Sequence, residues 1–167
     1  MKRAIVLLVV GLFMHFSAWT QPTFSIPGGG IYNPGEEICF NVTIDDFTDL
    51  LKVQYSIRWD PEVLEFNRVE GFNMADLDTS HFDLSLVQQG AISLSWEADS
   101  GEGLTLPDNI SIFQLCFNVV GECGGYTDIS IGGAPTPIEV FREGAANMNI
   151  NLFKMDGNAS VCAYPVI

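Results

Sequence analysis

From Gln21 onward, hydrophobic and polar residues alternate along most of the chain, as expected of β-strands with one buried face. In residues 37–44, for example, Ile38, Phe40 and Val42 share one side of the extended backbone. Proline, glycine and aspartate separate such segments at intervals that suit short strands. The pattern predicts strands at residues 23–26, 37–44, 51–59, 63–69, 82–87, 91–97, 111–120 and 127–131.

The C-terminal part is less regular. Residues 132–149 contain Pro135 and Pro137 and are predicted to be mostly loop, with a short helical turn at 138–143. Residues 150–155 and 159–164 flank Asp156-Gly157, which is typical of tight turns, so they are predicted to pair as a terminal hairpin. Eight or nine strands without intervening helices predict an all-β chain that folds as a two-sheet antiparallel β-sandwich.

The composition suits one packed domain. The chain has 167 residues, of which 47% are hydrophobic and 17% charged, enough apolar material for a single core over residues 21–167. With 7 Lys and Arg against 21 Asp and Glu, its formal charge is −14 and its pI is about 4.1. This charge excludes a nucleic-acid binder that works by neutralising phosphates.

Residues 1–20 have the features of a secretory signal peptide. Lys2 and Arg3 precede an apolar run at 4–14, and Ala18 and Thr20 have the spacing that a signal peptidase recognises. Cleavage there removes two cations and no anions, which takes the formal charge from −14 to −16. The apolar run is shorter than the roughly 18 residues of a membrane span, so we expect a secreted chain without one; the alternative is an uncleaved N-terminal anchor.

The four cysteines are predicted to form disulfides, because an exported chain folds in an oxidising compartment. They are Cys39, Cys116, Cys123 and Cys162. The sequence alone leaves three connectivities open, and four separate thiols are the alternative reading. A zinc site is not expected, because no Cys-x-x-Cys pair is present and His81 is the one histidine after residue 20.

Residues that catalysis needs are sparse. His81 has no companion base in its motif and is predicted to be a solvated loop histidine. Glu97, Asp99 and Glu102 lie near one strand end, but with 21 acidic residues such clusters arise by chance. We therefore predict that the protein is not an enzyme.

Calcium sites are also not expected. The stretch Asp76-x-Asp78-x-Ser80 begins like an EF-hand loop, but His81 and Val87 stand where that loop has glycine and glutamate. A second acidic turn, with Asp45, Asp46 and Asp49, is predicted to be solvated rather than to gather around a cation. No metal or cofactor is predicted.

Direct binding of sugar would call for exposed aromatic rings. Trp59 and Trp96 lie in the inward phase of their strands and are predicted to belong to the core. Tyr32, Tyr126 and Tyr164 remain as candidates, scattered in predicted loops. Polysaccharide binding is therefore an alternative function and not the first choice.

Four segments in order resemble the cohesin domain of bacterial cellulosome-type proteins, over roughly residues 23–164. They are residues 33–36, 56–66, 90–96 and 112–119, and the sharpest motif among them is Asp60-Pro61-x-x-Leu64. The resemblance implies a jelly-roll sandwich of about nine strands. It also places the strands of Cys39 and Cys116 side by side, which implies bridges Cys39–Cys116 and Cys123–Cys162.

The resemblance further implies a face that binds a calcium-loaded dockerin module. In the cohesin arrangement the predicted strands 51–59, 82–87 and 91–97 share a sheet. Their outward residues are Lys52, Gln54, Ser56, Arg58, Asp83, Ser85, Val87, Ser93, Ser95 and Glu97. Such hydroxyls, amides and mixed charges can hydrogen-bond a docking helix.

The resulting hypothesis is a secreted, non-catalytic binding module of the cohesin type. It would attach another protein at the cell surface or in an extracellular polysaccharide-degrading assembly. The alternatives are a carbohydrate-binding module and a stand-alone surface adhesin of the same fold. Two features depart from the cohesin pattern: the cysteine frame is not general in that family, and the chain holds a single module.

Overall fold

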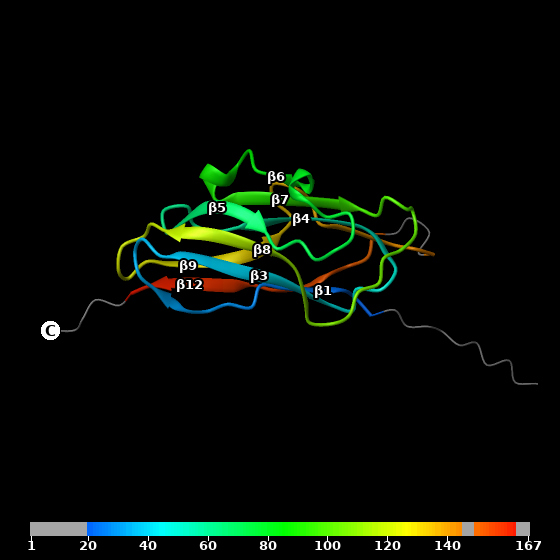
Figure 1. Ribbon diagram of the computed structural model, residues 1–167, viewed down its shortest axis with the longest axis horizontal. Helices are drawn as coiled ribbons and strands as arrows, with labels where there is room; N and C mark the ends of the chain where they lie inside the picture. Colours follow the sequence, from blue (N-terminus) through cyan, green and yellow to red (C-terminus); the bar gives the residue numbers. More distant parts are fainter. Residues whose placement is uncertain (1–19, 145–148, 163–167) are drawn as a thin grey trace, which may run out of the picture.

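The computed structural model describes residues 20–144 and 149–162, and it contains twelve strands in two stacked sheets (Figure 1). The five-stranded sheet has, in order, β11 (Phe153–Met155), β1 (Thr23–Ser25), β3 (Glu37–Asp45), β8 (Ile110–Val119) and β5 (Leu64–Glu70). The predicted β-sandwich is confirmed. Within the described ranges the helical elements are two short 3-10 turns, η1 (Thr79–His81) and η2 (Val87–Gln89).

The second sheet has seven strands. Their order is β2 (Ile31–Tyr32), β12 (Gly157–Val161), β9 (Tyr126–Gly132), β4 (Leu50–Arg58), β7 (Ala91–Glu97) and β6 (Phe82–Asp83), while β10 (Glu139–Arg142) pairs with the first half of β4. No helix in the described part of the chain has the length and hydrophobicity of a membrane span. The predicted signal peptide lies outside the described residues, apart from Thr20.

Both tryptophans lie in the core between the sheets, as predicted. Trp96 is fully buried and Trp59 is 6% exposed. Trp59 packs against Phe66 and Phe117, with ring centroids 6.1 and 5.0 Å away, and its indole N–H donates to the carbonyl of Leu64 at 2.9 Å. The Asp60-Pro61 turn thus returns the chain to the core where Trp59 is fixed.

Two local predictions were wrong, and one short strand was missed. The strand predicted at 82–87 ends at Asp83, whose carboxylate accepts the N–H of Ser85 and turns the chain toward η2. The helical turn predicted at 138–143 is β10, because the edge of β4 provides its hydrogen-bond partners. The short strand β2 was not predicted.

The predicted terminal hairpin is also wrong. β11 runs parallel to β1 in one sheet, while β12 pairs with β9 and runs parallel to β2 in the other. The chain crosses between sheets at Asp156, whose carboxylate accepts the N–H of Ile131. A Cβ at Gly157 would lie 2.6 Å from the carbonyl oxygen of Ile26, so the crossing needs a glycine. The two parallel pairs make both sheets mixed rather than purely antiparallel.

Tyr55 is the one described residue with a buried side-chain polar atom that lacks a hydrogen-bond partner. It is fully buried on β4, and burial raises the pKa of its hydroxyl. We expect Tyr55→Phe to raise the free energy of unfolding by about 1 kcal/mol, because it removes an unsatisfied hydroxyl. Denaturant unfolding measures this; the exposed Tyr126→Phe is the control, and a loss of stability in Tyr55→Phe would contradict the prediction.

Candidate partner-binding face

The three strands predicted to form the partner face do share one sheet. In the register of β4 with β7, Lys52 lies opposite Glu97, and Gln54 lies opposite Ser95. Ser56 and Arg58 lie opposite Ser93 and Ala91, and Asp83 of β6 lies on the far side of Ser93. The structure therefore brings eight of the ten predicted residues onto adjacent positions: Lys52, Gln54, Ser56, Arg58, Asp83, Ser93, Ser95 and Glu97. We call them the β4–β7–β6 face.

The middle of this face is covered by the loop between β9 and β10. The backbone N–H of Thr136 donates to Ser56 Oγ at 2.8 Å, and its hydroxyl donates to Ser93 Oγ at 2.8 Å. Ser56 is fully buried and Ser93 is 6% exposed. Gln54 is held too, since its amide donates to the carbonyl of Pro137. Ser56 and Ser93 thus fix the loop and are not available to a partner, contrary to expectation.

The last two predicted residues follow the end of β6. Ser85 is exposed beside Asp83, whereas Val87 begins η2 and is partly buried. Val87 lines a separate hollow of about 300 Å³ together with Phe66 and Val120. The early end of β6 therefore takes Val87 away from the strand pairing that the prediction assumed.

Two hollows flank the covering loop. The larger, about 550 Å³, is lined by Leu51, Lys52, Glu97, Phe141 and Arg142. In it Lys52 forms an ion pair with Glu139 at 2.6 Å and lies 5.7 Å from the ring centroid of Phe141. The smaller, about 190 Å³, is lined by Arg58, Leu86, Gln89, Ala91, Ala134 and Pro135.

The segment 133–142 is the part of this face that sequence reasoning missed. It supplies Thr136 over the centre, and Pro135 and Phe141 to the two hollows. Its glycines and prolines do predict a loop, but they do not indicate that the loop folds back over β4 and β7. In the structure, β10 alternates partly buried and buried residues, but its sequence Glu-Val-Phe-Arg has no matching alternation of polarity that could have indicated a strand.

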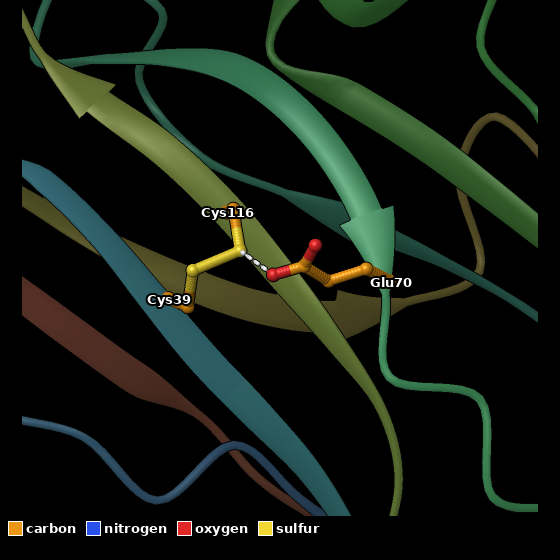
Figure 2. Close-up of side chains that lie close together, drawn as sticks. All are labelled: Cys39, Glu70 and Cys116. Atoms are coloured by element: carbon orange, nitrogen blue, oxygen red, sulfur yellow. Dashed lines mark hydrogen bonds between the residues drawn. A yellow bond between two sulfur atoms is a disulfide. The ribbon is translucent and has the colours of Figure 1, made fainter.

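The opposite outer face carries a disulfide with the carboxylate of Glu70 beside it (Figure 2). Cys39 and Cys116 are directly opposite in the β3–β8 register and are bonded, as the resemblance implied. Cys116 has the outward phase but is fully buried, since Cys39 and Glu70 lie against it. Cys123 and Cys162 form the second bridge, and the described residues contain no free cysteine.

Cys39, Cys116 and Glu70 are also the single group of described residues with three metal-ligating atoms within 4.8 Å. Both sulfurs are used in the disulfide, so they carry no thiolate charge for a metal and no proton for Glu70, whose oxygen lies 3.4 Å from Cys116 Sγ. Arg68 pairs with Glu70 and Glu37 and lowers the pKa of each carboxyl. This arrangement is structural.

Three of the aspartates in the predicted acidic clusters stabilise turns. The carboxylates of Asp45 and Asp49 accept hydrogen bonds from Asn109 N–H and the Thr105 hydroxyl. Asp78 caps η1, and its own N–H donates to Nδ1 of His81. Among the described residues, neither the 45–49 aspartates nor Glu97, Asp99 and Glu102 bring three carboxylates within 4.8 Å.

The tyrosines proposed as sugar-binding candidates differ in exposure. Tyr126 is 54% exposed, but Tyr32 packs against Phe40 with ring centroids 6.3 Å apart. Tyr164 lies outside the described residues. The polar β4–β7–β6 face, with its two hollows, is thus the best candidate site.

Comparison with known proteins gives a consistent picture. The family model for the cohesin domain matches residues 22–137, which include all three strands of the face. No curated protein sequence matches the chain. The solved structures described next are below 20% identity to this chain, so their similarity supports the fold alone.

Three of these structures illustrate the range. The seventh ScaB type I cohesin of Pseudobacteroides cellulosolvens is 15% identical with a TM-score of 0.69, over 88% of this chain and 96% of that one. A chain of the Coh-OlpA-Doc918 cohesin-dockerin complex of Clostridium thermocellum is 12% identical with a TM-score of 0.68, over 85% of this chain and 99% of that one. A non-cellulosomal cohesin of the archaeon Archaeoglobus fulgidus is 17% identical with a TM-score of 0.64, over 86% of this chain and 93% of that one. Because the family model spans more than half of the sequence, the chain belongs to the cohesin domain family.

Proposed function

We propose that the chain is a secreted, non-catalytic binding module that holds a calcium-loaded dockerin module on the β4–β7–β6 face. The match of the cohesin family model over all three strands of the face carries this proposal. Similar folds come from structures described as cohesin-dockerin complexes. The two disulfides suit an extracellular or cell-surface setting, because oxidising compartments preserve them.

The geometry of the face supports a protein partner over a polysaccharide. Its exposed positions are hydroxyls, amides and charges around two hollows, and strand pairing together with the covering loop holds their backbone in place. A helical module can hydrogen-bond such a surface without new ordering of the backbone. The wider role, attachment within a polysaccharide-degrading assembly, follows from the same partner class.

Isothermal calorimetry with residues 21–167 tests the proposal. The titrants are dockerin modules encoded by the same source, with calcium and with EGTA, next to a panel of soluble polysaccharides. Binding of a dockerin that EGTA abolishes supports the proposal. Binding of polysaccharide alone overturns it in favour of a carbohydrate-binding module, and binding of neither points to an adhesin.

A substitution on the face provides a sharper prediction. Ser95 is exposed on β7 opposite Gln54. Ser95→Trp is expected to weaken dockerin binding by roughly tenfold or more, because an indole overpacks a close-fitting interface. Asn118→Trp, on the outer face of the other sheet, is the matched control and should leave the dissociation constant within about twofold. Equal effects of the two variants would place the partner elsewhere.

A further inference from the structure

Arg58 differs from every other cation in the described part of the chain. That part contains five cationic side chains, and four of them are engaged. Lys52 pairs with Glu139, Arg68 with Glu37 and Glu70, and Lys154 with Asp156, while the buried Arg142 donates to the carbonyls of Thr48 and Thr20. Arg58 is exposed and has neither an ion pair nor a side-chain hydrogen bond with any described residue.

The backbone around Arg58 is held by strand pairing on both sides. The residue lies at the end of β4, opposite Ala91 of β7 on one side and Ser130 of β9 on the other. The chain enters β7 through Gly90, which has φ of +70° and would place a Cβ 2.2 Å from the carbonyl oxygen of Trp59. This close approach fixes the wall of the small hollow against the end of β4, so the site is formed before a partner arrives.

The small hollow beside Arg58 has the chemistry of a carboxylate site. Arg58 and the amide of Gln89 are its polar groups, and its walls are Leu86, Ala91, Ala134 and Pro135. Guanidinium binds a carboxylate through two parallel hydrogen bonds, and once a partner covers the hollow its apolar walls would strengthen the attraction by limiting water at the pair. No carboxylate lines the hollow to neutralise the arginine.

The negative charge of the molecule makes the hollow beside Arg58 a favourable place for an acidic group of a partner. With 21 acidic residues against 7 basic ones, an acidic partner side chain is repelled over most of the surface. The unpaired Arg58 lies at one end of the β4–β7–β6 face, whereas Lys52 at the other end is already neutralised by Glu139. An acidic group of a partner therefore has one favourable end of the face at which to dock.

We propose that Arg58 and its hollow bind an aspartate or glutamate side chain of the protein that occupies the β4–β7–β6 face. This inference rests on the proposed function and adds a specificity-determining contact. The contact orients the partner, because a single carboxylate site at one end of the face distinguishes the two directions in which a module can lie.

Calorimetry with the dockerin that binds most tightly tests the inference through Arg58→Gln, Arg58→Lys and the matched control Arg68→Gln. Arg68→Gln removes the same charge from the opposite sheet. We expect Arg58→Gln to raise the dissociation constant roughly tenfold or more, since it leaves the partner's carboxylate unpaired. The dissociation constant of Arg58→Lys should lie between those of the unmodified chain and Arg58→Gln, because lysine keeps the charge but not the paired hydrogen bonds. The dissociation constant of Arg68→Gln should stay within twofold of that of the unmodified chain at the same ionic strength.

A charge-reversal experiment identifies the partner group. Arg58→Glu is titrated with dockerins in which each surface Asp or Glu is changed in turn to Arg, and one such change should restore binding. If the unmodified chain binds no dockerin, the proposed function fails and this inference with it. If it binds and Arg58→Gln remains within twofold, or Arg68→Gln weakens binding equally, the inference alone is overturned.

Discussion

Replacement of Trp96 by alanine is expected to lower the free energy of unfolding by about 3–5 kcal/mol, the range for removing a buried large aromatic side chain. Trp96 is fully buried on β7, and its ring centroid lies 6.0 Å from that of Phe47. Its indole N–H donates to the carbonyl of Ala75 at 3.0 Å, which fastens the loop after β5 to the core. Alanine loses the packing and the hydrogen bond together.

Guanidinium unfolding followed by circular dichroism measures this effect. Trp96→Phe keeps much of the apolar contact but leaves the Ala75 carbonyl without its donor, so a smaller loss of about 1–3 kcal/mol is expected. Tyr126→Ala, at an aromatic residue that is 54% exposed, is the control and should stay within about 0.5 kcal/mol. A Trp96→Ala variant as stable as this control would show that the sandwich does not pack around the indole.

Removal of the disulfides has the second large effect. The double variants Cys39→Ala/Cys116→Ala and Cys123→Ala/Cys162→Ala are each expected to lower the free energy of unfolding by about 2–4 kcal/mol. Without the bridge, the unfolded chain has more conformational entropy. The bridges close loops with sequence separations of 77 and 39 residues. A doubling of loop length adds about 0.6 kcal/mol, so loss of the Cys39–Cys116 bridge should cost more by about that amount.

Unfolding midpoints of the two double variants and of the intact chain, measured without reductant, provide the comparison. In excess dithiothreitol, the unfolding midpoint of the intact chain should lie below those of both double variants, because reduction breaks both disulfides. A greater loss from the Cys123–Cys162 variant would contradict the entropic order and indicate that local packing around Val161 governs that bridge.

The long strands of this protein were predictable because their signal is local. The period of two in β3, β4, β7 and β8 reports which side chains face the core, and the same pattern correctly placed both tryptophans inside. The pairing of the cysteines was not local information. It came from a family resemblance that put β3 beside β8.

The candidate site was predictable only in part. The outward phase of β4 and β7 correctly brought Gln54, Ser95 and Arg58 to one face. The same reasoning could not detect that Thr136, which is 80 residues from Ser56 and 43 from Ser93, would cover the centre. It also could not show that Lys52 is paired and Arg58 is not, since Glu139 reaches Lys52 only after β10 joins β4.

By itself, the sequence determined that this chain is an acidic, disulfide-capable sandwich with an aromatic core and a polar outer flank, because alternation and charge are properties of neighbouring residues. Only the tertiary structure decided which strands cross between sheets, which polar residues the 133–142 segment buries, and which cation remains unpaired. These depend on contacts between residues far apart in sequence, where backbone hydrogen bonds and close packing outweigh local preference.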